Sequence, residues 1–136
     1  MASSNKQLIL CVDDEKVVLN SLRQQLQSSF GDQYQYEIAE SAEEAWEIIS
    51  ELKSENVEIV LIISDWLMPG KKGDEFLIEL HKKYPKVVTM MLTGHADDAA
   101  VENAKKNANL FACIRKPWSK EELVENIQRA FQKLHQ

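Results

Sequence analysis

Short apolar segments alternate with longer amphipathic segments along the sequence, and this alternation restricts the available folds more than any other feature. Four apolar segments are nearly continuous in hydrophobicity and rich in β-branched residues, and a fifth is weaker. The four cover residues 8–12, 59–63, 87–92 and 110–114, and the weaker one covers 34–39. Continuous apolar runs are typical of parallel strands that are buried on both faces of a sheet. We therefore expect four buried parallel strands and a fifth strand nearer an edge.

The longer segments have the periodicity of amphipathic helices, because apolar residues recur in them every three or four positions. One such row is formed by Val18, Leu22, Leu26 and Phe30, whereas the segment 96–106 has only a thin apolar face. Strands and helices thus alternate five times along the chain. Parallel strands that are joined by helices through right-handed crossovers form a doubly wound α/β domain.

Two of the expected helices have a recognisable start. Ser41 and Ser119 each stand three residues before a glutamate, which is the pattern of a capping box. A length of 136 residues fits one domain. We expect a single domain over residues 1–136, with an ordered core from about 6 to 134, and no second domain within the chain.

Composition excludes several classes of function. The chain has 16 basic and 22 acidic residues and a formal charge of −6, so we expect no binding to nucleic acid or to an anionic membrane. Its longest apolar run, 59–63, is far shorter than the ~20 residues that cross a bilayer. Cys11 and Cys113 lie in apolar runs without metal-ligand spacing, and the sequence begins with a short polar lead-in. We therefore expect buried, reduced thiols in a cytoplasmic protein.

Polar residues gather directly after four of the expected strands, and ligands bind at the carboxyl ends of parallel strands. Asp13 and Asp14 follow the first strand, Asp65 the third, Thr93 the fourth and Lys116 the fifth. Two carboxylates about 4 Å apart repel by about 4 kcal/mol at an effective dielectric constant of 20, so three of them together need cations. Lys116 offsets one charge, and Mg²⁺, which binds carboxylate, phosphate and water oxygens, offsets two more. The cluster predicts a Mg²⁺ site that receives a phosphoryl group.

Each residue of this cluster then has an expected chemical role. A carboxylate can attack phosphorus and form an acyl phosphate, and Asp65 is the best candidate because it ends the most buried central strand. Asp13 and Asp14 would hold the metal, while Thr93 and Lys116 would hydrogen-bond or neutralise the phosphoryl oxygens. Taken alone, each residue also fits an ordinary structural role, such as a helix cap, a turn or a solvated charge.

At these residues the sequence resembles the receiver domains of two-component response regulators. The resemblance extends from about residue 6 to 134 and is carried by four stretches in the expected order and spacing, namely residues 11–15, 63–73, 91–94 and 114–118. It implies a five-stranded parallel sheet with the flavodoxin-like strand order 2-1-3-4-5. It also implies a single receiver domain that acts as a phosphoacceptor and not as an enzyme, and that assists only its own phosphorylation and dephosphorylation.

The resemblance also assigns residues and partners. It implies that Asp65 accepts phosphate from a sensor histidine kinase, a phosphotransfer protein or a small phosphodonor. It implies a Mg²⁺ ion held by Asp13, Asp14, Asp65 and the backbone carbonyl of Leu67, and a switch hydroxyl and a phosphate-contacting ammonium on Thr93 and Lys116. Phosphorylation is expected to change the face made by the fourth helix, fifth strand and fifth helix. That face would contact an output domain or a second copy of the chain.

Four positions are candidate modulators of the site. Leu67 and His95 match family positions that line the mouth of the site and influence the lifetime of the phosphate. Three residues before Lys116 the family usually carries Tyr or Phe, whereas this chain has Cys113, and its aromatic residue is Phe111. Because side chains alternate along a strand, we expect Phe111 to face the same side as Cys113 and to pack as fixed core. We expect Cys113 to be a small buried hydrophobe rather than a redox sensor. Because its side chain is too small to sweep the volume of an aromatic ring, the signal would depend on the threonine and on movement of loops and helices.

Three other functions stay open at this point. A receiver-like docking module that works without phosphate would not need the complete set of acids, threonine and lysine. A Mg²⁺-dependent phosphohydrolase would in one form have Asp-x-Asp after the first strand and a lid domain, whereas the acids here are adjacent. A flavodoxin-like cofactor binder needs a Ser, Thr or Gly loop after the first strand, where this chain has acids at 13–15.

Overall fold

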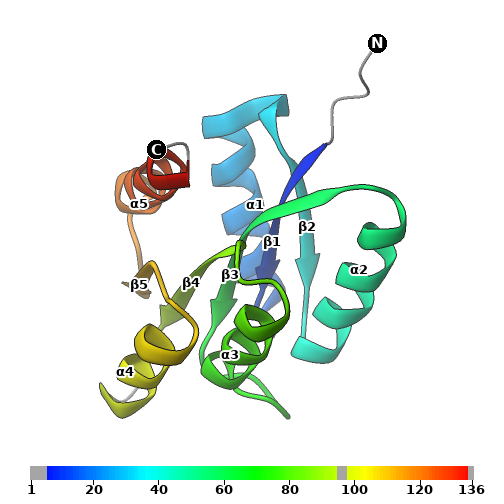
Figure 1. The fold of residues 1–136 in the computed structure, drawn as a ribbon. Helices are drawn as coiled ribbons and strands as arrows, with labels where there is room; N and C mark the ends of the chain where they lie inside the picture. Colours follow the sequence, from blue (N-terminus) through cyan, green and yellow to red (C-terminus); the bar gives the residue numbers. More distant parts are fainter. Residues whose placement is uncertain (1–5, 95–97, 135–136) are drawn as a thin grey trace.

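The computed structural model describes residues 6–94 and 98–134, and within these ranges five parallel strands form one sheet (Figure 1). The strand order is β2-β1-β3-β4-β5, which confirms the doubly wound, flavodoxin-like arrangement. The weakest apolar segment forms β2 at one edge, as expected. The strands are β1 (Gln7–Val12), β2 (Gln35–Ala39), β3 (Glu58–Asp65), β4 (Val88–Thr93) and β5 (Ala112–Arg115).

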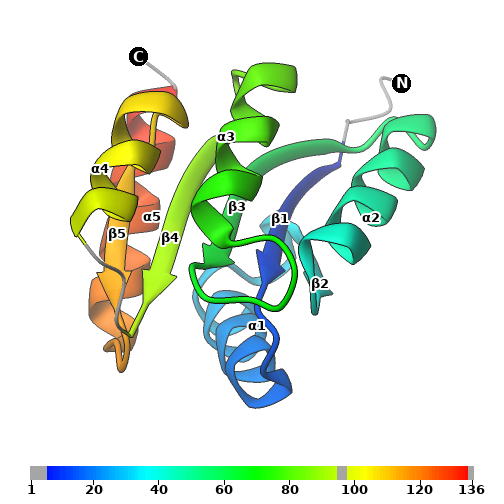
Figure 2. The same cartoon turned by 90° about the horizontal axis from the view of Figure 1, so that it is seen from below.

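Five α-helices of the described ranges cover both faces of the sheet. Figure 2 shows α2, α3 and α4 on one face and α1 and α5 on the other. Within those ranges, no helix combines the length and the apolar character that a membrane span needs. The helices are α1 (Lys16–Phe30), α2 (Ala42–Ser54), α3 (Gly73–Lys83), α4 (Asp98–Asn107) and α5 (Lys120–Leu134), and a short 3₁₀ helix, η1 (Gly31–Gln33), follows α1.

The central strand β3 separates two apolar clusters. Ile62 packs with α2 and α3 on one face of the sheet, whereas Leu61 and Ile63 pack with α1 and α5 on the other, and all three are fully buried. This two-sided burial explains why β3 reads as a continuous apolar run. In α1 the buried row contains Leu19 and not Val18, which is half-buried, so the expected apolar row differs by one position there.

Serine caps begin two of the helices. The Ser41 hydroxyl accepts a hydrogen bond from the Glu44 backbone N–H at 3.0 Å, and the Ser119 hydroxyl accepts one from the Glu122 N–H at 3.1 Å. In a capping box the glutamate carboxylate accepts a hydrogen bond from the backbone N–H of the capping serine. The Glu44 carboxylate accepts instead from the Glu40 N–H at 3.3 Å. Both helix starts thus have the side-chain cap that the sequence predicts.

The fifth strand begins later than the sequence suggests. The chain turns after α4 at Asn109, whose φ is 52°, and β5 begins only at Ala112. The Phe111 N–H donates to the Thr89 carbonyl at 2.8 Å, and the Phe111 ring packs on the α1 and α5 side. Cys113 packs on the opposite side, so the expectation that it shares a face with Phe111 is wrong. The alternation of side chains does not extend into this turn.

The connection from β3 to α3 folds back tightly against the end of β3. The Gly73 N–H donates to the Trp66 carbonyl at 2.7 Å. A Cβ atom at Gly73 would lie 2.0 Å from the Asp65 carbonyl oxygen, far inside van der Waals contact. Only glycine therefore allows the first turn of α3 to approach the backbone of Asp65 so closely.

We predict that Gly73→Ala destabilises the protein by about 2 kcal/mol, because the methyl group must displace the Asp65 backbone. Helix propensity alone predicts the opposite sign, a stabilisation of up to about 1 kcal/mol. Urea denaturation measures the difference. Gly94→Ala is the matched control, since a Cβ atom there meets nothing within 4 Å. A Gly73→Ala protein that is as stable as the control would contradict the close approach.

Candidate functional site

The carboxyl ends of four strands bring acidic, hydroxyl and ammonium groups to one edge of the sheet. Asp13 directly follows β1, Asp65 ends β3, Thr93 ends β4 and Lys116 directly follows β5. Asp65 pairs in register with Leu92, the residue before Thr93, so β3 and β4 end at nearly the same level. The parallel topology thus places residues from distant parts of the sequence side by side.

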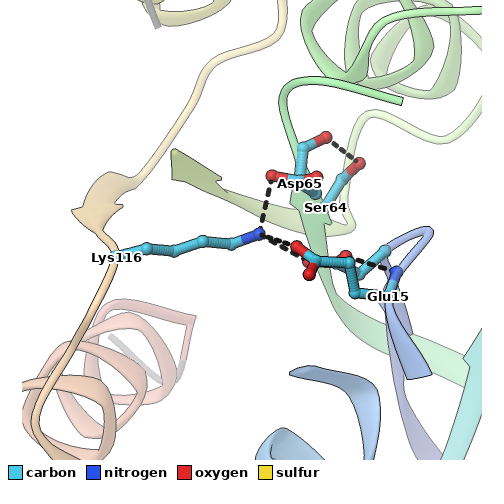
Figure 3. A network of polar contacts seen from close by, with 5 residues as sticks. Glu15, Ser64, Asp65 and Lys116 are labelled. Carbon is cyan, nitrogen blue, oxygen red and sulfur yellow. Dashed lines mark hydrogen bonds and ion pairs between the residues drawn. The ribbon is translucent and has the colours of Figure 1, made fainter. Parts of the chain in front are cut away.

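Lys116 reaches across this edge to both buried acids, of which Asp65 is labelled in Figure 3. Its Nζ lies 2.9 Å from Asp13 Oδ2 and 3.1 Å from Asp65 Oδ1, and 4.0 Å from Glu15 Oε1. Asp13 is 0% exposed and Asp65 is 5% exposed. Buried carboxylates are costly unless they are paired, so Lys116 is what allows both acids to lie beneath the surface.

Asp14 adds a third carboxylate to the same place. Carboxylate oxygens of Asp13, Asp14 and Asp65 all lie within 4.8 Å of one another, and Asp14 is exposed whereas the other two are buried. One ammonium group faces these three acids, so two negative charges stay uncompensated by the lysine. A cluster of hard oxygen donors with excess negative charge has the chemistry of a site for Mg²⁺.

The ionisation of the site shows this shortage of positive charge. Burial and, to a smaller extent, the charge of Asp13 raise the pKa of Asp65, and the hydrogen bond from Lys116 only partly opposes them, so the pKa rises from 3.8 to about 6. Burial by itself would lower the pKa of Lys116, but its hydrogen bonds to Asp13 and Asp65 raise it overall. Lys116 therefore stays an ammonium ion, whereas ionisation of Asp65 costs more free energy in the folded protein than in water.

Backbone hydrogen bonds fix the ends of the strands around the acids. The Asp13 N–H donates to the Ala39 carbonyl at 3.0 Å, and Asp13 Oδ1 accepts from the Glu15 N–H at 2.9 Å. The Ser64 hydroxyl donates to the Asp65 carbonyl at 3.0 Å. Asp13 in particular is held at both its backbone and its side chain, so its second oxygen stays directed at Lys116.

Thr93 and Lys116 are joined through the backbone. The Lys116 N–H donates to the Thr93 carbonyl at 2.9 Å, and Thr93 is 5% exposed. The Lys116–Pro117 peptide bond is cis. The backbone hydrogen bond thus links the end of β4 to the residue that carries the ammonium group.

The loop after β3 forms one wall of an open cavity of about 430 Å³, whose lining includes Asp14, Asp65 and Lys116. Leu67 also lines it and is 59% exposed. The loop is held by a hydrogen bond from the Trp66 indole N–H to the buried Asp74 carboxylate at 3.1 Å. Asp14 and Asp65 thus line a cavity that is open to solvent.

The candidate modulators have different surroundings. Leu67 lies at the mouth of the cavity, where the sequence analysis expects it, whereas His95 lies outside the described residues. Cys113 is half-buried rather than fully buried, and burial raises the pKa of its thiol. A raised pKa keeps the thiol protonated, which argues against a reactive thiolate. Phe111 packs on the opposite face of the sheet from Cys113.

Two residues that shape this site are not among those predicted from the sequence. Gly73 allows α3 to approach Asp65, and Asp74 holds the Trp66 side chain. Gly73 stands at the expected start of a helix and directly before Asp74. A glycine at such a position is only a weak sequence signal of a close approach between helix and strand. Nothing in the sequence alone pairs Asp74 with Trp66, because the pair depends on how the loop folds back.

We predict that Asp65→Asn stabilises the protein at pH 7.5 in the absence of divalent metals. The pKa of Asp65 is higher in the folded than in the unfolded state, so its contribution to stability is present below about pH 4. That contribution is lost as the pH rises through about 6. The variant escapes this loss, and we expect it to be about 2 kcal/mol more stable at pH 7.5. The difference should shrink towards zero near pH 4.

Urea denaturation with a chelator present, repeated from pH 4 to pH 7.5, measures this effect. Glu47→Gln is the matched control, because Glu47 is an exposed acid on α2 and its loss should change stability by less than about 0.5 kcal/mol. A wild-type protein that is at least as stable as Asp65→Asn across the whole range would contradict the described charge balance.

Comparisons with known proteins agree with this geometry. The hydrogenase transcriptional regulatory protein HoxA of Cupriavidus necator is 27% identical over 94% of this chain, which is 25% of that protein. The sensor kinase CckA of Brucella abortus is 32% identical over 96% of this chain, which is 13% of that protein. The chain therefore spans a quarter or less of the length of these two curated relatives.

A solved structure and a family model cover most of the chain. The crystal structure of a CheY-like response regulator receiver domain protein from Methanospirillum hungatei is 32% identical. It has a TM-score of 0.81 and covers 97% of this chain and 98% of its own. The family model described as the response regulator receiver domain matches residues 9–128. The chain belongs to the response regulator receiver domain family, a family of signalling domains of two-component systems.

Proposed function

We propose that this chain is a phosphoacceptor switch, in which Asp65 takes a phosphoryl group from a histidine kinase or a phosphotransfer protein. The observation that carries this proposal is the Lys116 ammonium group between Asp13 and Asp65, beside a third acid and an open cavity. It stays a prediction that a histidine kinase is the phosphate donor. It also stays a prediction that the protein is cytoplasmic and that residues 1–136 form a single domain.

The chemistry of the transfer follows from the carboxylate. An oxygen of Asp65 attacks phosphorus and forms an acyl phosphate, while the P–N bond of a phosphohistidine breaks and its electron pair goes to the imidazole. Asp65 lies beside the cavity, so one of its oxygens can meet a donor that enters from solvent. Lys116 already contacts Asp65 and supplies a positive charge for the phosphoryl oxygens.

The donor set fits a Mg²⁺ ion. Asp13, Asp14 and Asp65 supply three hard oxygen ligands, and Lys116 alone leaves them under-compensated. We propose that these acids and the backbone carbonyl of Leu67 hold the ion. When bound, Mg²⁺ neutralises charge on the oxygens of a transferring phosphoryl group. Asp13 is held for this role by the Glu15 N–H on one oxygen and by Lys116 on the other.

The switch would act through the two residues that meet the new phosphoryl group. Thr93 and Lys116 end β4 and follow β5, and a backbone hydrogen bond joins them. The phosphoryl group shifts the conformational equilibrium of the domain through contacts that exist only after phosphorylation. We propose that these contacts change the face of α4, β5 and α5, which would bind an output domain or a second copy.

We predict that Asp65 is the phosphoacceptor. Incubation with acetyl phosphate and Mg²⁺ should add the mass of one acid-labile phosphoryl group, and Asp65→Asn should gain none. Asp32→Asn is the matched control, since Asp32 follows the C-terminal end of α1, whereas Asp13 and Asp14 precede its N-terminal end, and its loss should not affect labelling. Equal labelling of Asp65→Asn and wild type would contradict the assignment. A wild-type protein that gains no phosphoryl group would favour a phosphate-independent docking module.

We predict that the conformational response depends on Thr93 and not on Cys113. Cys113 is half-buried on the face of the sheet that α2, α3 and α4 cover, and it is too small to sweep the volume of an aromatic ring. Hydrogen exchange before and after phosphorylation should change most in residues 98–118. Cys113→Ala should keep most of this response and Thr93→Ala should lose most of it. The reverse result would make Cys113 the moving element.

A further inference from the structure

A second hollow lies at the opposite end of the sheet from the acids. This basal pocket has a volume of about 360 Å³ and lies between the ends of α2 and α3 and the start of β3. Its lining includes Glu58 and Ile59 at the start of β3, whereas Asp65 ends the same strand, and Figure 1 draws the direction of β3 as an arrow. Since β3 runs from Glu58 to Asp65, the two sites are about 20 Å apart along the strand.

The interior of the basal pocket is apolar. Ile49, Ile62 and Leu80 form its floor, and all three are almost completely buried. Its sides are formed by apolar residues that are only half-buried, so apolar surface stays open to solvent there. These residues are Val57, Ile59, Tyr84 and Val87.

The rim of the basal pocket is positively charged. Lys53, Lys83 and Lys86 line it and are exposed, and within the described ranges none of them forms an ion pair. The Nζ atoms of Lys53 and Lys83 lie 5.0 and 5.8 Å from the centre of the Tyr84 ring. The acid in the lining, Glu58, accepts a hydrogen bond from Gln7 at 3.5 Å. The whole chain has a formal charge of −6, whereas this group of lysines makes the surface around the basal pocket positive.

We propose that the basal pocket binds a small organic carboxylate, with its apolar body inside the hollow and its carboxylate at the lysine rim. The volume is at the lower end of the range for small-molecule sites, about 300–1,000 Å³, and such sites combine an apolar lining with a few polar groups. The Tyr84 ring offers an aromatic contact at the edge, so an aromatic body fits best. The site does not depend on phosphorylation.

Nuclear magnetic resonance titration with 2-naphthoate tests this proposal. We expect saturable shifts of the backbone amides of Val57, Ile59, Tyr84 and Val87, with a Kd of about 0.5 mM, as suits a ligand of this size. The neutral amide, 2-naphthamide, has the same apolar body and should bind at least about fivefold more weakly, because it lacks the charge that meets the lysines.

Variants separate charge from shape. Lys53→Gln and Lys83→Gln should each weaken 2-naphthoate binding about threefold and leave 2-naphthamide binding unchanged. Lys82→Gln is the matched control, since Lys82 is an exposed lysine of α3 outside the lining. Asp65→Asn should bind 2-naphthoate as wild type does. The absence of saturable shifts, shifts centred elsewhere, or equal binding of the acid and its amide would each overturn the proposal.

Discussion

The ammonium group of Lys116 between Asp13 and Asp65 is the interaction on which the carboxyl edge of the sheet depends. Its contacts at 2.9 and 3.1 Å join the ends of β1, β3 and β5 and allow two acids to be buried. With Asp14 included, however, one cation faces three carboxylates. The two buried acids are therefore paired, but the site is still short of positive charge, and this shortage favours the binding of a divalent cation.

The sheet topology explains why such a cluster forms from residues far apart in sequence. Parallel strands all end at the same edge, so each strand delivers the residue that follows its last buried position. The close approach of Gly73 to Asp65 and the bond between Asp74 and Trp66 then hold the loop after β3 beside the acids. The opposite edge of the same sheet has the reverse character, with an apolar hollow under exposed lysines. One small domain thus presents two surfaces of opposite charge.

Most of the fold was predictable because hydrophobic periodicity alone separates buried parallel strands from amphipathic helices. The residues of the site could be named because acids, Thr93 and Lys116 directly follow apolar runs. The side on which Phe111 packs could not be predicted, since it depends on the turn at Asn109 and not on strand alternation. The role of Asp74 was equally hidden, because its pairing with Trp66 arises only when the loop folds back on β3. Local pattern therefore predicts which elements form and their order along the chain, whereas the loops and the start of β5 need the three-dimensional structure.

The position of a bound divalent cation tests the charge imbalance around Lys116 most directly. Small amounts of Mn²⁺ broaden the amide signals of residues close to the ion in an isotope-labelled protein. We expect the signals of residues 13–14 and 65–67 to broaden first, excess Mg²⁺ to restore them, and Asp13→Asn to require much more Mn²⁺ for the same effect. Broadening that begins instead at exposed acids of α2 such as Glu43, and that Mg²⁺ does not reverse, would contradict a metal site between Asp13, Asp14 and Asp65.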